Sequence, residues 1–192
     1  MLKSLYDWTI SLAGHPRALW ALAIVAFIEA SVFPIPPDVL MIPMIIAAPR
    51  RAFLIAAVGT VSSVLGGLLG YAIGALAFEQ IGYPILSALG KGDAIVTFNE
   101  RFNSLDFWPV LIAGLTPFPY KVITIMSGWT GLPLGTFIVT SILARAGRFF
   151  LVALLLWKFG APIRDFIEKR LGLMTMLFIV LLLGGFYAVR FL

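Results

Sequence analysis

The sequence contains no cysteine and a single histidine, His15. The absence of cysteine excludes disulfide bonds, thiolate nucleophiles and cysteine metal ligands. One histidine also leaves too few ligands for a transition-metal site. The hydroxyl groups of Ser62, Ser63 and Thr116 have no triad-like arrangement of a base and an orienting acid around them. We therefore predict no enzymatic activity, no metal and no cofactor.

Charged residues are scarce as well. They make up 12% of the 192 residues, whereas 61% are hydrophobic; a soluble domain usually carries about 25% charged and about 45–50% apolar residues. The formal net charge of +5 does not indicate nucleic-acid binding, because the basic residues stand at the ends of apolar segments. Basic residues in that position set the orientation of membrane segments and contact anionic lipids. The composition thus predicts an integral membrane protein.

Long apolar segments follow one another along the chain, and a bilayer core of about 30 Å needs about 20 such residues as a helix. Residues 1–16 are instead typical of a short helix at the membrane interface. We predict an all-α polytopic fold with a domain over 17–170, two halves at about 18–78 and 107–159, and a final span over 171–192. The apolar segments are Ala18–Ala48, Ala52–Phe78, Phe107–Gly131, Gly135–Phe159 and Leu171–Val189.

Two of these segments are interrupted by proline, which removes a backbone N–H group and restricts the residue before it. Positions 34, 36 and 38 match positions 117, 119 and 121 at a constant offset of 83 residues. Paired proline-broken segments in two halves are typical of a transporter-like site at a repeat interface. The sequence therefore predicts two re-entrant hairpins in an inverted repeat. The prolines at the breaks are Pro34, Pro36, Pro37, Pro117 and Pro119.

The distribution of basic residues favours re-entrant segments. If each broken segment leaves by the face it entered, eight basic residues share one side of the membrane and two lie in the opposite connector. Such an excess marks the cytoplasmic side, so we predict a bacterial inner-membrane protein with a cytoplasmic N-terminus. The larger group comprises Lys3, Arg17, Arg50, Arg51, Lys158, Arg164, Lys169 and Arg170, and the smaller one Lys91 and Arg101.

Two further patterns concern packing. The spacing Gly66-x-x-x-Gly70-x-x-x-Gly74 places small residues on one helix face, which lets neighbouring helices approach closely. In the polar stretch 79–106, the apolar residues Ile95, Phe98, Phe102 and Leu105 recur at helical spacing and predict a short surface helix.

Five ionisable residues fall within the apolar segments: Glu29, Asp38, Lys121, Arg145 and Arg148. A charge at the bilayer centre costs at least about 2.5–3.5 kcal/mol, so such residues face the protein interior or water and pair with one another. They could be buried ion pairs that hold helices together. The functional interpretation is a polar cavity in which Lys121, Arg145 and Arg148 bind an anionic head group and Glu29 and Asp38 exchange protons.

The sequence resembles the DedA family of bacterial membrane proteins, also called the VTT or SNARE-associated domain, and looks most like its YqaA-type branch. The resemblance covers about residues 20–160. It rests on Phe27-Ile28-Glu29 with the Pro34–Asp38 break, on Pro117-Phe118-Pro119-Tyr120-Lys121 with Ser127-Gly128, and on Ala144–Phe149.

This resemblance implies two re-entrant hairpins in an inverted repeat and a role in membrane homeostasis. Some relatives are implicated in the proton-coupled movement of undecaprenyl phosphate or phosphatidylethanolamine, and eukaryotic relatives are lipid scramblases. By position, Glu29 and Asp38 match the family's essential acids, and either Arg145 or Arg148 matches a later essential arginine. Lys121 stands where many members have arginine, whose guanidinium binds phosphate through two parallel N–H groups as an ammonium group does not.

The leading hypothesis is a translocase that moves an anionic phospholipid or polyprenyl phosphate between leaflets, with membrane lipids as its partners. A proton-coupled exporter of small cationic solutes is one alternative, and a non-transporting membrane organiser that binds lipid or a partner protein is another. Both a monomer and a homo-oligomer are compatible with the sequence.

Overall fold

The computed structural model describes residues 17–32, 36–77, 80, 84, 92–116 and 118–160, with the backbone alone for 92–96 and 98. The predicted interfacial helix over 1–16 and the predicted final span over 171–192 lie outside the described residues. Pro34, Lys91 and Pro117 lie outside them too.

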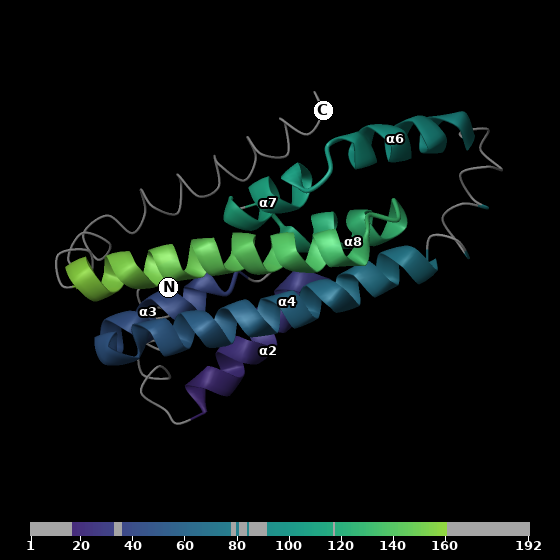
Figure 1. The fold of residues 1–192 in the computed structure, drawn as a ribbon. Helices are drawn as coiled ribbons and strands as arrows, with labels where there is room; N and C mark the ends of the chain where they lie inside the picture. Colours follow the sequence, from purple (N-terminus) through teal and green to yellow (C-terminus); the bar gives the residue numbers. More distant parts are fainter. Residues whose placement is uncertain are drawn as a thin grey trace, which may run out of the picture.

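The described part of the chain contains helices and no strand, which confirms the predicted all-α class (Figure 1). Among the described residues, two helical stretches, Pro49–Ala77 and Leu134–Gly160, are long and apolar enough to cross a membrane. In chain order the elements are α2 (Ala18–Ser31), α3 (Asp38–Ala47), the short 3₁₀ helix η1 (Pro49–Arg51), α4 (Ala52–Ala77), α6 (Gly92–Ser104), α7 (Trp108–Leu115), α8 (Tyr120–Trp129) and the Leu134–Gly160 helix.

Both predicted proline breaks separate pairs of short helices. Pro37 is the N-cap of α3 and Pro119 is the N-cap of α8. At 1.5 Å per residue, the 14 residues of α2 extend about 21 Å and the 10 residues of α3 about 15 Å. Each is shorter than a bilayer core of about 30 Å, and so is each of α7 and α8, with 8 and 10 residues.

The two long helices lie side by side and run in opposite directions (Figure 1). A Cβ added at Gly59 of α4 would lie 3.4 Å from the Phe149 ring, and one at Gly67 would lie 3.5 Å from the Phe137 ring. The two helices are therefore antiparallel. The ring of Phe53, near the start of α4, also packs against Trp157 with centroids 5.8 Å apart.

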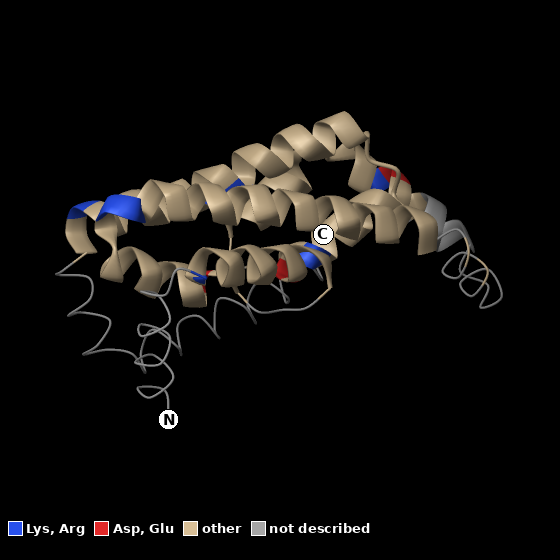
Figure 2. Ribbon diagram, turned by 90° about the horizontal axis from the view of Figure 1, so that it is seen from below, with Lys and Arg blue, Asp and Glu red and all other residues tan. Residues whose placement is uncertain are grey.

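Two separate apolar clusters fill the bundle. The first joins the start of α2, the end of α3, the first half of α4 and the second half of the Leu134–Gly160 helix. The second joins the last residues of α2 to α6, α7, α8 and the start of the Leu134–Gly160 helix. Most of the ribbon carries no charge, and the charged segments are found mainly near the ends, with a few inside the bundle (Figure 2).

The glycine face of α4 is packed against two helices, as its spacing predicts. An added Cβ at Gly66 would overlap the backbone carbonyl of Phe27 in α2, and one at Gly74 would overlap the carbonyl of Ile125 in α8. In return, Gly128 of α8 lies against the backbone of Tyr71 in α4. These contacts involve main-chain atoms, which cannot turn aside as a flexible side chain can.

Gly74→Val is therefore expected to prevent close packing of α4 on α8 and to lower stability by more than about 3 kcal/mol, the upper end of the usual cost of overpacking. The measurement is the yield of monodisperse protein in detergent and its thermal unfolding midpoint. Gly135→Val is the matched control, because an added Cβ there meets nothing within 4 Å. Equal behaviour of the two variants would contradict the packing role of this glycine face.

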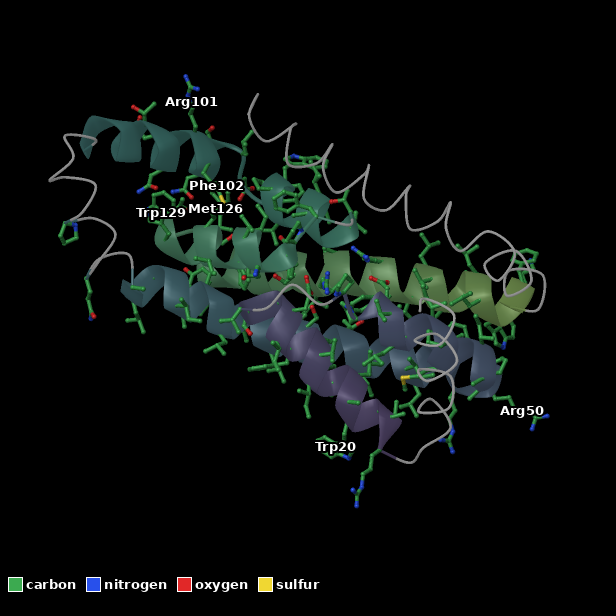
Figure 3. The ribbon with its side chains drawn as sticks, turned by 180° about the vertical axis from the view of Figure 1, so that it is seen from behind. Trp20, Arg50, Arg101, Phe102, Met126 and Trp129 are labelled. Carbon is green, nitrogen blue, oxygen red and sulfur yellow. The ribbon has the colours of Figure 1, made fainter. Side chains whose placement is uncertain are left out.

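Helix α6 confirms the surface helix predicted from the apolar spacing. Phe102 is buried, and Figure 3 shows it beside Met126 and Trp129, where α6 lies over α8. The Asn103 side chain donates a hydrogen bond to the Thr130 carbonyl at 2.8 Å. The helix ends before Leu105, which is exposed, and Asp106 then takes a left-handed conformation with φ 51°.

Candidate functional site

A buried ion pair joins α2 to the Leu134–Gly160 helix. Arg145 Nη2 lies 2.9 Å from Glu29 Oε2, and the side chains are 2% and 9% exposed. Arg145 Nε donates a second hydrogen bond, to the Ser63 hydroxyl of α4, at 2.7 Å. Because an unpaired charge would be very costly here, this pair fixes three helices relative to one another.

Aromatic rings cover the Arg145 guanidinium. Its central carbon lies 4.7 Å from the ring centroid of Tyr120 and 4.6 Å from that of Phe149, which are cation–π distances. Tyr120 is itself fully buried, and its hydroxyl is hydrogen-bonded to the Ser141 hydroxyl at 2.7 Å. Arg145 is therefore held on several sides and has almost no contact with the surroundings of the bundle.

A second ion pair lies at the start of α3, and it is more accessible. Arg148 Nη2 lies 2.6 Å from Asp38 Oδ2, and the side chains are 16% and 18% exposed. Arg148 Nη1 donates to the backbone carbonyl of Thr116, the C-cap residue of α7. One guanidinium thus connects the first turn of α3 with the end of α7.

Lys121 occupies a different environment from the two arginines. Its ammonium group donates to the backbone carbonyl of Val32 at 3.0 Å, and it has no acidic partner within the described ranges. Val32 is the C-cap of α2, so Lys121 places a positive charge where a helix C-terminus leaves carbonyl groups unpaired. Thr124, one turn further along α8, donates to the Ala30 carbonyl at 2.9 Å.

The broken helices therefore meet in crossed pairs. The end of α2 contacts the start of α8, because Tyr120 N also donates to Glu29 Oε1 at 3.3 Å. The end of α7 contacts the start of α3 through Arg148. Glu29 contacts the N-terminus of the neighbouring α8, and Asp38 lies in the first turn of α3. Lys121 and Arg148 contact the C-cap carbonyls of α2 and α7, so each charge complements the dipole of the helix end that it contacts. Each break is thus bonded to residues outside the pair of short helices that it separates.

The structure brings four of the five predicted site residues together as two ion pairs and places the fifth, Lys121, on a carbonyl group. Pro36, Pro37 and Pro119 lie at the breaks. Within the described ranges no group of three histidine or acidic side chains is placed to hold a metal ion. Sequence patterns did not predict the neutral residues that surround these charges, namely Ser63, Tyr120, Thr124, Ser141 and Phe149.

Comparison with known proteins places these motifs in a family. The VTT domain profile matches residues 35–158, a stretch that holds Pro36 and Pro37 of the first break, the whole second break and both arginines. The chain belongs to the VTT-domain (DedA) family. This confirms the resemblance of the sequence motifs to DedA proteins. VTT-domain proteins are membrane-associated and transporter-like.

Two relatives resemble the chain over most of its length. An uncharacterized protein of Haemophilus influenzae is 37% identical over 169 residues, which are 86% of this chain and 88% of the relative. An uncharacterized protein of Histophilus somni is 38% identical over 169 residues with the same coverage of both chains. No solved structure matches the chain.

Proposed function

We propose that this VTT-domain protein moves an anionic phospholipid or a polyprenyl phosphate between membrane leaflets. Arg148 receives the phosphate, Lys121 adds a second positive charge, and Asp38 exchanges a proton. The observation that carries the proposal is the partly exposed Asp38–Arg148 pair at two broken helix ends. Ionisable groups inside membrane segments mark substrate or ion pathways unless they only join helices.

The difference in exposure assigns separate roles to the two arginines. Arg145 is 2% exposed and is enclosed by Glu29, Ser63 and two aromatic rings. A lipid phosphate cannot reach it without opening the bundle, so Arg145 acts as a structural anchor. Arg148 is 16% exposed, and a guanidinium can bind a phosphate through two parallel N–H groups. Arg148 is therefore the proposed phosphate ligand.

Proton coupling follows from competition at Arg148. An ionised Asp38 holds the guanidinium through the 2.6 Å contact, whereas a protonated Asp38 has lost the charge that competes with an anion. A lipid phosphate should thus bind more tightly as the pH falls and leave more readily as the pH rises. This cycle would return Arg148 to Asp38 after each transfer.

We further propose that α2–α3 and α7–α8 are re-entrant hairpins related by an inverted repeat. The short lengths of these helices support this proposal, and so does the packing of Ala18 and Leu22 from α2 in one cluster with Met44 and Ile45 from α3. The crossed hydrogen bonds add to it, because the end of α2 is bonded to the start of α8 and Arg148 bridges the end of α7 and the start of α3. Under this arrangement, the Val32 and Thr116 carbonyls occupy corresponding positions.

Membrane orientation provides a direct test of the hairpins. Figure 3 shows Arg50 and Arg101 at opposite ends of the bundle, both pointing outward. Impermeant thiol reagents are expected to label Arg17→Cys and Arg50→Cys from the cytoplasmic side and Arg101→Cys from the other side. The chain contains no competing cysteine. Labelling of Arg17→Cys and Arg50→Cys from opposite sides would remove the first re-entrant hairpin.

Substitutions of Lys121 test the proposed phosphate site. Lys121→Ala is expected to weaken phosphatidylglycerol binding about tenfold, because it removes a hydrogen bond from a charged group. Such a bond contributes about 1.5 kcal/mol. Lys121→Arg should bind like the parent, because it keeps the charge and the donors. Binding is measured in nanodiscs of phosphatidylcholine containing phosphatidylglycerol, with Arg50→Ala as the control for general surface charge. Parent-like binding by Lys121→Ala would remove Lys121 from the site.

The two alternatives make different predictions for the same variants. An exporter of cationic solutes would require Asp38 but would gain from the loss of Lys121, because a positive charge repels the substrate. A non-transporting organiser would tolerate Asp38→Asn if packing were kept. Transport by the parent, Asp38→Asn and Lys121→Ala in reconstituted vesicles therefore distinguishes the three functions.

A further inference from the structure

The Arg148 guanidinium holds two separate elements as well as facing the proposed lipid site. Its Nη2 atom contacts Asp38 in the first turn of α3, and its Nη1 atom contacts the C-cap carbonyl of α7. We infer that phosphate binding at Arg148 releases the end of α7 from the start of α3, so that the substrate itself opens the contact between the two broken segments. This inference rests on the proposed function and adds a coupling step to it.

The limited exposure of Arg148 supports this competition. With 16% of the side chain exposed, most of the guanidinium faces Asp38, Thr116 and the bundle. A phosphate that takes two parallel N–H groups requires the guanidinium to turn outward. If Nη2 turns outward, it loses its contact with the Asp38 carboxylate. If Nη1 turns outward, it loses its hydrogen bond to the Thr116 carbonyl. Binding and release of the contact are therefore a single event at one side chain.

The other crossed contact, between the end of α2 and the start of α8, is held by buried bonds. Glu29, Tyr120, Thr124 and Arg145 are all buried. Besides the ion pair, three hydrogen bonds join the end of α2 to the start of α8, and the two from Tyr120 N and Thr124 are buried. Gly67 and Gly70 of α4 also lie directly against Thr124. The end of α2 and the start of α8 are thus fixed. Helices α3 and α7 lie in different apolar clusters, and Arg148 is the side chain that bonds to both of them. The structure has one releasable contact and one fixed contact.

The prediction is tested by distances between spin labels on the outer surface of the helices. Val39 of α3 and Ile112 of α7 are 49% and 56% exposed, and cysteines introduced there are the sole labelling sites. Electron paramagnetic resonance is recorded in phosphatidylcholine nanodiscs with and without phosphatidylglycerol, and lipid binding is measured on the same samples. The Val39–Ile112 distance should shift to larger values when phosphatidylglycerol binds.

A second pair of labels controls for general loosening of the bundle. Ile24 of α2 and Val61 of α4 are exposed on helices joined by the glycine face, and their distance should not change. In Arg148→Gln, the Val39–Ile112 distance should already be long and should not respond to the lipid. Lys158→Gln, which removes an exposed cation on the same helix, should behave like the parent.

The possible failures are distinguishable. If the parent binds phosphatidylglycerol through Arg148 and the Val39–Ile112 distance does not change, the coupling is wrong and the proposed phosphate site stands. If Arg148→Gln binds phosphatidylglycerol as the parent does, the phosphate site is wrong and the coupling that depends on it is wrong too. The measurement on the parent alone decides the coupling, so poor folding of the variant would not obscure it.

Discussion

Glu29→Gln is expected to lower stability by about 3–5 kcal/mol, because it leaves Arg145 as a buried charge with no opposite charge beside it. For a chain of this size, such a loss corresponds to a fall in the thermal unfolding midpoint on the order of 10 °C. The hydrogen bond from Arg145 to Ser63 and the two aromatic rings remain, but none of them supplies a negative charge. We expect this variant to fail in folding before it fails in transport.

Asp38→Asn is the matched control for this prediction. It removes the same charge from the more exposed pair, in which Asp38 and Arg148 are 18% and 16% exposed. Water and lipid head groups can solvate Arg148, so the fall in the midpoint should be much smaller. Thermal unfolding of both variants is followed in the same detergent. A similar fall in both would contradict the division into a structural pair and a functional pair.

The second large effect concerns the function of Asp38→Asn. Asparagine has the shape of a protonated aspartate but cannot regain its charge, so Arg148 stays available to an anion at every pH. We expect phosphatidylglycerol to bind about tenfold more tightly than in the parent at high pH, which corresponds to removing a competing charged hydrogen bond of about 1.5 kcal/mol. Translocation should nevertheless be abolished, because Asp38 no longer displaces the lipid.

The pH profile provides the sharpest form of this comparison. In the parent, phosphatidylglycerol affinity should fall as the pH rises, since deprotonated Asp38 takes Arg148 back from the lipid. In Asp38→Asn the affinity should not vary with pH. Phosphatidylglycerol is the suitable probe because its phosphodiester keeps one negative charge throughout the range. A variant that retains the pH dependence of the parent would show that another group is responsible.

Sequence patterns predicted the helices well where the residues are distinctive. Proline at positions 36, 37 and 119 removes backbone donors, and the breaks lie where those prolines are. The three glycines of α4 predicted close packing, and added Cβ atoms there would overlap neighbouring helices. The ends of the predicted spans agree with α4 and the Leu134–Gly160 helix to within one residue. These features depend on local chemistry, which a single sequence displays directly.

The partners of the charged residues were less accessible to sequence reasoning. Lys121 and at least one of the two arginines were predicted to face the same cavity as Glu29 and Asp38, because pairing reduces the cost of burial. The structure shows which charges pair: Glu29 with Arg145, and Asp38 with Arg148. Arg145 and Arg148 stand three residues apart on one helix face, so their spacing does not distinguish a structural arginine from a phosphate-binding one. The two arginines differ in exposure because the rings of Tyr120 and Phe149 cover the guanidinium of Arg145.

Lys121 illustrates a further limit of sequence reasoning. Its partner is the main-chain carbonyl of Val32, and a backbone acceptor has no signature in the sequence. The same is true of the Thr116 carbonyl that accepts from Arg148. The proline breaks do indicate that unpaired carbonyl groups exist nearby, but the crossed pairing of α2 with α8 and of α7 with α3 depends on the tertiary arrangement.

Reconstitution into liposomes tests the central claim most directly. Fluorescent phosphatidylglycerol and fluorescent polyprenyl phosphate are each placed in one leaflet, and their arrival in the other leaflet is followed with an impermeant quencher. The parent is expected to move at least one of these lipids faster than protein-free liposomes do, and Arg148→Gln should move neither. Movement by Arg148→Gln at the parent rate, or no movement of either lipid by the parent, would contradict the account.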